Sequence, residues 1–171
     1  MVVDLNYLKV KKYFLLIIFF LLFTTKSFSE NLKFKKIVSL NDPWGSSFIN
    51  KSELIITEKS GKIKIVNIIS NKITSIEHNL NFLEYGQGGL LDIIYKNNNI
   101  WISYSEDRGN WKTSTSIAKA KLNNEKLNFT NIFQANPPID SGYHFGSRLA
   151  IKGDYLYASA GERGQGMIAQ D

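Results

Sequence analysis

The chain has 171 residues, of which 43% are hydrophobic and 21% charged, values that are ordinary for a globular protein and argue against disorder. Its net charge of +6 comes mostly from scattered lysines, with no arginine cluster or RNA-binding aromatic motif. We therefore attribute the charge to a solvated surface and expect no nucleic-acid partner. There is no cysteine, so the fold does not rely on disulfide bonds.

Residues 1–29 have the composition of a secretory signal peptide. A basic segment at 9–12 precedes an uninterrupted apolar run at 13–23, and small residues lead to a cleavage site between Ser29 and Glu30. The alternative is an uncleaved anchor, but the apolar run is shorter than the about 20 residues that a membrane-spanning helix needs. We expect a periplasmic or secreted protein with no stable membrane anchor after cleavage.

From Glu30 onward, short runs rich in Ile, Val, Tyr, Phe and Thr alternate with Asn, Gly, Lys and Ser. This pattern is typical of β-strands joined by turns, and no long stretch keeps a helical period. Three segments align with one another, each consisting of a first strand, led by glycine, that returns through a polar turn to a second strand. The predicted strand pairs are 44–49 with 54–58, 89–95 with 100–105, and 146–151 with 155–159.

The first two segments each continue with two more predicted strands, at 62–66 and 72–76 and then at 115–120 and 126–133. Four antiparallel strands at a period of about 45–55 residues are typical of a β-propeller blade. A β-sandwich of hairpins is the alternative, but the recurrence of the glycine-led strand favours the propeller. The expected fold is therefore all-β, with about the first two and a half blades of a propeller.

The third unit ends after its second strand, at Asp171. A propeller is stabilised by closure of its ring, and an open end leaves edge strands unpaired. The sequence interpretation is that residues 30–171 are the truncated N-terminal part of a longer propeller, and that this part alone is inactive.

The loops that precede the glycine-led strands carry the candidate site. In a propeller these strands line the central channel, and the loops before them meet at one end of it. Here the loops are 41–43, 84–88 and 141–145, so Gln87 and His144 are expected to converge on one channel mouth.

His144 is the candidate catalytic residue, because an imidazole can accept a proton near neutral pH. Gly142 and Gly146 flank it and would allow a ligand or backbone to approach closely. Gln87 is the candidate substrate-binding residue, because its amide can both donate and accept hydrogen bonds. Taken singly, each is better interpreted as a turn residue, and it is their convergence that favours a site; the other histidine, His78, lies in a polar, Asn-rich context.

In the order and spacing of their motifs, residues 38–171 resemble the soluble sugar dehydrogenases that depend on pyrroloquinoline quinone (PQQ). These form the glucose/sorbosone dehydrogenase family, and the likeness is greatest to its aldose sugar dehydrogenase branch. The motifs that carry the resemblance lie at residues 43–45, 54–63, 86–92, 103–105, 144–149, 161–165 and 169–171.

The resemblance implies a six-bladed propeller that holds pyrroloquinoline quinone at the channel mouth, with a calcium ion polarising the quinone. His144 matches the family's catalytic histidine, which removes the anomeric hydroxyl proton while hydride passes to the quinone. Gln87 matches the family's sugar-contacting glutamine. The implied function is a periplasmic oxidoreductase that converts aldose sugars to lactones and passes electrons on to an acceptor.

Two departures qualify this picture. Tyr143 stands where the glucose dehydrogenases have an aspartate before the histidine, which puts the orientation and basicity of His144 and the sugar preference in question. Most family residues that bind quinone and calcium lie in later blades, so no cofactor-binding or metal-binding residue is assigned. A non-catalytic sugar- or protein-binding propeller, an inactive remnant of the enzyme and a metal-dependent lactone hydrolase remain alternatives, although the acidic ligand set for the last is not evident.

We predict that the signal peptide is removed after Ser29, because the apolar run is short and small residues surround this bond. Mass spectrometry of the exported protein is expected to find Glu30 at the N-terminus. Intact Met1 in the membrane fraction would contradict cleavage.

Overall fold

The computed structural model describes residues 32–123 and 125–167, so the predicted signal peptide lies outside the described part. The chain divides into two units, Met1–Lys35 and Lys36–Asp171. The described residues of the first, 32–35, are irregular and exposed. A search of the described residues found no helix long and apolar enough to cross a membrane.

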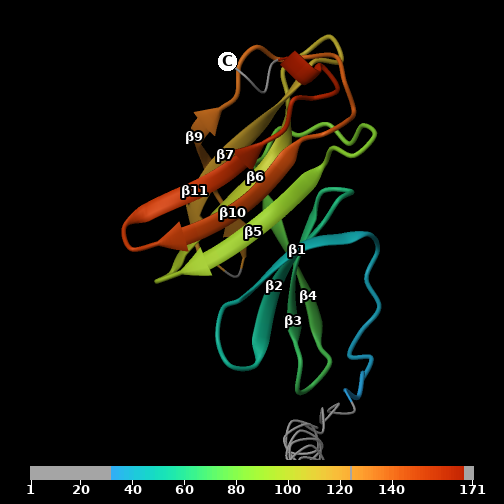
Figure 1. Cartoon of the computed structure of the whole chain (residues 1–171). Coiled ribbons are helices and arrows are strands. Elements are labelled where there is room, and N and C mark those ends of the chain that lie inside the picture. The colour runs from blue at the N-terminus through green and yellow to red at the C-terminus, as the bar shows by residue number, and fades with distance from the viewer. Residues whose placement is uncertain (1–31, 124, 168–171) are drawn as a thin grey trace, which may run out of the picture. The chain divides into compact units, whose positions relative to one another are not determined.

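The described part of the second unit is built from β-strands in three sheets (Figure 1). The first sheet has the order β1-β2-β3-β4-β8, the second β5-β6-β7-β9 and the third β10-β11. This arrangement confirms the predicted all-β propeller, with two complete blades and the first two strands of a third. The strands are β1 (Pro43–Phe48), β2 (Glu53–Glu58), β3 (Lys62–Asn67), β4 (Ile73–His78), β5 (Leu90–Lys96), β6 (Asn99–Asp107), β7 (Thr113–Lys121), β8 (Lys126–Leu127), β9 (Thr130–Gln134), β10 (Gly146–Lys152) and β11 (Tyr155–Ala160).

The pattern at 126–133 predicts one strand, and this prediction is wrong. β8 pairs in parallel with the end of β4 in the first sheet, whereas β9 pairs with β7 in the second. The break lies at Phe129, because the Asn79 side chain accepts from its N–H (2.7 Å) and donates to its carbonyl (3.0 Å). Leu127 and Phe129 are buried in the core at this crossing, which ties the end of the second blade to the first.

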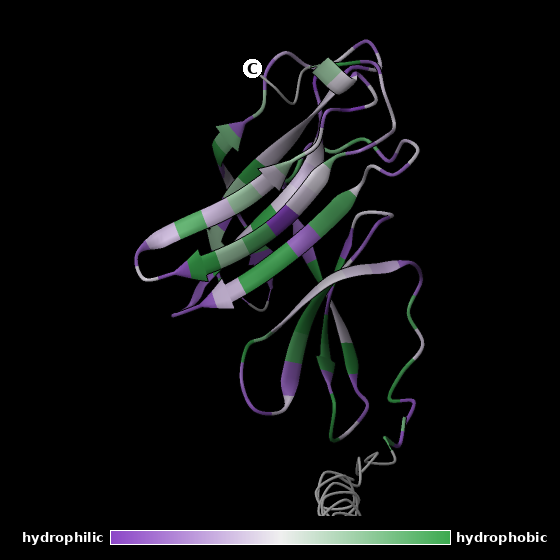
Figure 2. Ribbon diagram, in the orientation of Figure 1, coloured by the Kyte–Doolittle hydropathy of each residue, from purple (hydrophilic) through white to green (hydrophobic). Residues whose placement is uncertain are grey.

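A single apolar core joins the first two sheets. Ile55 and Ile63 of the first sheet are fully buried and belong to one cluster with Ile93 and Ile102 of the second. Figure 2 shows the hydrophobic segments along β2, β3 and β5 that contribute to it. Burying an isoleucine side chain stabilises a fold by about 1.5–3 kcal/mol, so this cluster is the main attraction between the two blades.

The first strand of each sheet, β1, β5 or β10, is called its inner strand here. Between the first and second sheets, a side-chain hydroxyl links the backbones of the two inner strands. A register shift interrupts β1, and Gly45 within it donates its N–H to Thr57 Oγ1 at 2.9 Å. The Thr57 hydroxyl in turn donates to the Leu91 carbonyl of β5 at 2.5 Å. The hydroxyl therefore satisfies two buried main-chain groups that register shifts in β1 and β5 remove from their strand ladders.

The same relay repeats between the second and third sheets. Asp92 donates its N–H to Ser103 Oγ at 3.0 Å, and the Ser103 hydroxyl donates to the Ser147 carbonyl at 2.6 Å. In the third sheet the N–H of Arg148 donates to Ser159 Oγ, again at 3.0 Å. Ser159 is exposed, and no carbonyl in the described part of the chain accepts from its hydroxyl.

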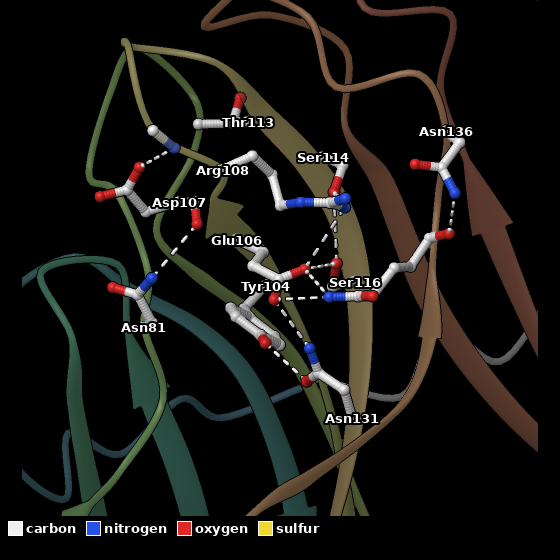
Figure 3. Close-up of polar contacts among 12 residues, drawn as sticks. Asn81, Tyr104, Glu106, Asp107, Arg108, Thr113, Ser114, Ser116, Asn131 and Asn136 are labelled. Atoms are coloured by element: carbon white, nitrogen blue, oxygen red, sulfur yellow. Dashed lines mark hydrogen bonds and ion pairs between the residues drawn. The ribbon is translucent and has the colours of Figure 1, made fainter.

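A buried carboxylate holds the outer edge of the second sheet together (Figure 3). Glu106 accepts hydrogen bonds from Ser116 Oγ (2.6 Å), Asn131 Nδ2 (2.8 Å) and Gln134 Nε2 (2.7 Å). Burial raises the pKa of Tyr104 to about 12, so its hydroxyl stays neutral and donates to Asn131 Oδ1 at 2.6 Å. Because the side chains of β9 are exposed, this polar network fixes the strand where apolar burial does not.

We predict that Thr57→Val lowers the free energy of unfolding by about 1–3 kcal/mol, the cost of leaving buried main-chain groups unpaired. The matched control is Ser159→Ala, which removes the same hydroxyl from an exposed position and is expected to change stability by no more than about 0.5 kcal/mol. Urea unfolding of the purified chain measures both. Equal losses would mean that the relay is not the source of the stability.

Candidate active site

Three segments meet at the open end of the β10–β11 hairpin, opposite its turn. The loop 84–88 precedes β5, the loop 141–145 precedes β10, and residues 161–163 follow β11. The N–H of Gln87 donates to the Gly142 carbonyl at 2.6 Å, which joins the first two segments through their main chains. The predicted convergence of these two loops is confirmed.

Gln87 and His144 are in direct contact. The Gln87 side-chain oxygen accepts a hydrogen bond from the His144 main-chain N–H at 2.9 Å. This bond helps to hold His144 in a left-handed conformation (φ 49°) that few residues other than glycine adopt. The Gln87 Nε2 group makes no hydrogen bond within the described part of the chain and so can still donate to a ligand. The roles of these two residues in catalysis and substrate binding stay predictions.

The His144 ring is held by a carboxylate. Its Nδ1 pairs with Oε1 of Glu162, and the two side chains are 54% and 26% exposed. The hydrogen bond from His144 holds the pKa of the Glu162 carboxyl below its ordinary value, so the carboxylate is ionised at neutral pH. An ionised carboxylate only accepts, which assigns the proton to Nδ1. In a neutral ring, Nε2 is then the nitrogen with an available lone pair.

Hairpin register brings Glu162 to this position. Gly146 pairs with Ala160, so the residues after β11 lie beside the residues before β10. Gly161 donates its N–H to the Phe145 carbonyl at 3.0 Å, and a methyl group on Gly161 would collide with the carbonyl oxygen of His144. The glycine therefore permits the approach that places Glu162 at His144.

The structure shows which side chain orients the His144 ring, and it is not Tyr143. This side chain is exposed, and its ring lies edge-on to the His144 ring at 6.3 Å between centroids. The carboxylate that orients His144 comes instead from Glu162, eighteen positions later in the sequence. In the sequence, Glu162 lies within the motif at 161–165, which by itself assigns it no role. The register of the predicted hairpin 146–159 was the signal that could have found it.

The described residues offer no cluster of acidic side chains for a calcium ion. Within 32–123 and 125–167 no group of three or more His, Cys, Asp or Glu side chains could hold a metal ion. The buried Asp92 carboxylate is already engaged: Oδ2 accepts from the Leu149 N–H (2.8 Å), and Oδ1 accepts from the Ile93 N–H (3.0 Å) and Arg148 Nη1 (3.2 Å). What this part of the chain supplies is a proton acceptor and a polar amide beside it.

Known proteins resemble this chain in sequence and fold. The sequence model of the family described as Glucose / Sorbosone dehydrogenase matches residues 40–171. Aldose sugar dehydrogenase YliI of Escherichia coli K12 is 29% identical over 142 residues, which are 77% of this chain and 38% of that protein.

Solved structures agree with the sequence matches. One described as glucose dehydrogenase is 27% identical with a TM-score of 0.71, over 77% of this chain and 44% of its own. The PQQ-bound aldose sugar dehydrogenase of Streptomyces coelicolor has a TM-score of 0.68 over 78% and 42% of the two chains; at 23% identity it shows the fold alone. The chain spans less than half the length of each of these relatives.

We predict that Gly161→Ala displaces the His144 backbone and lowers the free energy of unfolding by about 1–3 kcal/mol, the usual cost of overpacking. Gly166→Ala is the matched control, because a methyl group there meets nothing within 4 Å and is expected to be neutral. Thermal unfolding of the two variants measures the difference. A Gly161→Ala variant as stable as the control would contradict the tight approach.

Proposed function

The chain belongs to the Glucose / Sorbosone dehydrogenase family, and on this premise we propose that the whole protein is a periplasmic aldose dehydrogenase with pyrroloquinoline quinone as hydride acceptor. The family match and the aldose sugar dehydrogenase relative support sugar oxidation, and the resemblance of residues 38–171 to the PQQ-dependent sugar dehydrogenases supports the choice of cofactor. The observation that carries the proposal is the His144–Glu162 pair beside Gln87. The character of residues 1–29 supports export.

His144 is the proposed general base. Oxidation of an aldose at its anomeric carbon removes the C–H hydrogen as hydride and the hydroxyl hydrogen as a proton, which leaves the lactone carbonyl. His144 Nε2 accepts the proton, since Nδ1 is engaged by Glu162. Glu162, ionised because its pKa is lowered, stabilises the imidazolium that forms. The quinone, when bound, supplies the acceptor for the hydride.

Gln87 is proposed to act through both ends of its amide. Its oxygen holds the main chain of His144, and its nitrogen remains available to donate to a sugar hydroxyl. A residue with both tasks influences substrate binding and the geometry of the base together. Gln87→Ala is therefore expected to raise KM and to lower kcat as well. No step is assigned to calcium, because the described residues provide no ligand set for it.

We predict that His144→Ala lowers the turnover number of the whole protein by about 10²–10⁴-fold, the usual contribution of a general base. The assay is aldose oxidation after reconstitution with quinone and calcium, using an artificial electron acceptor. Quinone affinity is expected to change little, because no quinone contact is assigned to this residue.

The matched control is His78→Ala. His78 ends the outer strand β4, where its Nδ1 accepts from the Leu80 N–H (3.2 Å) and its Nε2 bonds the Gly61 carbonyl (2.8 Å). These contacts are structural, so the variant is expected to lose some stability but to keep its turnover number. Equal activity of the two variants would overturn the assignment of His144 and favour a non-catalytic binding propeller.

A further inference from the structure

A buried arginine directly follows the carboxylate of the candidate site. Arg163 is only 5% exposed, and burial lowers its pKa to about 10, so it carries a charge at neutral pH. Within the described part of the chain, no carboxylate forms an ion pair with it. Burying such a charge is costly unless its donors are satisfied, so the contacts of its guanidinium group indicate why it is there.

Those contacts are carbonyl groups of the segment that bears His144. Nε donates to the Tyr143 carbonyl at 3.0 Å, and Nη2 donates to the Ser141 carbonyl. The other side of the group is anchored to the start of β7, where Nη1 donates to the Thr113 carbonyl (3.0 Å) and Nη2 to Thr113 Oγ1 (2.6 Å). The planar guanidinium therefore bridges β7 and the segment 141–145.

Arg163 also fixes the residue on the other side of His144. The carbon of its guanidinium lies 3.7 Å from the ring centroid of the buried Phe145, as in a stacked cation–π contact. Its own main-chain N–H donates to the His144 carbonyl at 3.4 Å. Residues before, at and after His144 are thus held by one arginine.

The backbone of Arg163 is itself in a constrained state. Its φ is 58°, a left-handed value that is unfavourable for a residue other than glycine. This conformation persists because the side chain is anchored at both ends. With the Arg163 side chain held inward, the preceding residue, Glu162, is directed toward the His144 ring.

We propose that Arg163 is the positioning residue of the candidate site, which holds the 141–145 segment so that His144 Nδ1 faces Glu162 and Nε2 faces the substrate. The importance of that orientation for turnover rests on the proposed function, whereas the orientation itself does not. Lysine cannot replace arginine here, because one ammonium group cannot bridge the two segments or stack on a ring.

Histidine NMR on the full chain provides the test. The sequence contains only two histidines, so ¹⁵N ring signals separate into His144 and the internal reference His78. In the parent chain, His144 is expected to show the fixed Nδ1-protonated form. In Arg163→Lys its ring shifts are expected to move to the average of two exchanging tautomers, while the signals of His78 stay unchanged.

Arg108→Lys is the matched control. Arg108 is a partly buried arginine whose Nη1 donates to Ser114 Oγ at 3.1 Å and lies 3.8 Å from Glu106 Oε2. Its replacement removes a guanidinium without touching the 141–145 segment, so both histidines are expected to be unaffected. If Arg163→Lys does not fold, Thr113→Val removes the hydroxyl that accepts from Arg163 Nη2 and donates to the Ser141 carbonyl at 3.3 Å, and it is expected to shift His144 in the same direction.

Unchanged His144 signals in a folded Arg163→Lys chain would overturn the proposal. If Arg163→Lys does not fold, unchanged His144 signals in Thr113→Val would overturn it. Shifts at both histidines would also overturn it, since they indicate a general loss of structure. In the whole protein, Arg163→Lys is expected to lower kcat by about 10²-fold, the effect of a misplaced catalytic group, with a smaller change in KM. Altered His144 signals with full activity would refute the proposed role of His144 and leave the positioning role of Arg163 intact.

Discussion

The side-chain hydroxyls of Thr57 and Ser103 are the constraint on which the arrangement of the sheets depends. Each accepts from a bulged N–H of its own blade and donates to a carbonyl of the next inner strand. Apolar burial draws neighbouring blades together but is not directional, so it does not by itself set how the inner strand of one blade is aligned along that of the next. The hydroxyl bonds are directional, and each satisfies groups that would otherwise be buried and unpaired.

The candidate site inherits its geometry from this constraint. Ser103 holds the carbonyl of Ser147, three residues after His144, so the start of β10 is fixed relative to β5. The loop that carries Gln87 leads into β5, and the contact between its side chain and the His144 backbone requires this alignment. Arg163 then adds a second attachment, from β7 to the carbonyls around His144. Sheet register and a buried cation together determine where the imidazole lies.

The sequence alone was sufficient for the blades and for the meeting of two loops. Strand periodicity and turn residues are local properties, and they placed nine of the eleven described strands with small errors at the ends. The recurrence of a glycine-led strand predicted that the loops before β5 and β10 share one end of the sheets, as the Gln87–His144 contact confirms. The family resemblance rested on motifs with fixed spacing, and the match over residues 40–171 bears it out.

Only the tertiary structure decided the contacts made by side chains across those units. The split of 126–133 depends on the Asn79 amide, fifty residues earlier in the chain, which occupies the main chain of Phe129. Glu162 and Arg163 are neighbours in one sequence motif, and the sequence does not show which way each side chain points. In the structure, Glu162 points to the imidazole of His144, whereas Arg163 points into the protein. Local sequence determines which backbone conformations are available, but the direction of a side chain is set by which distant donors and acceptors remain unsatisfied when the sheets pack.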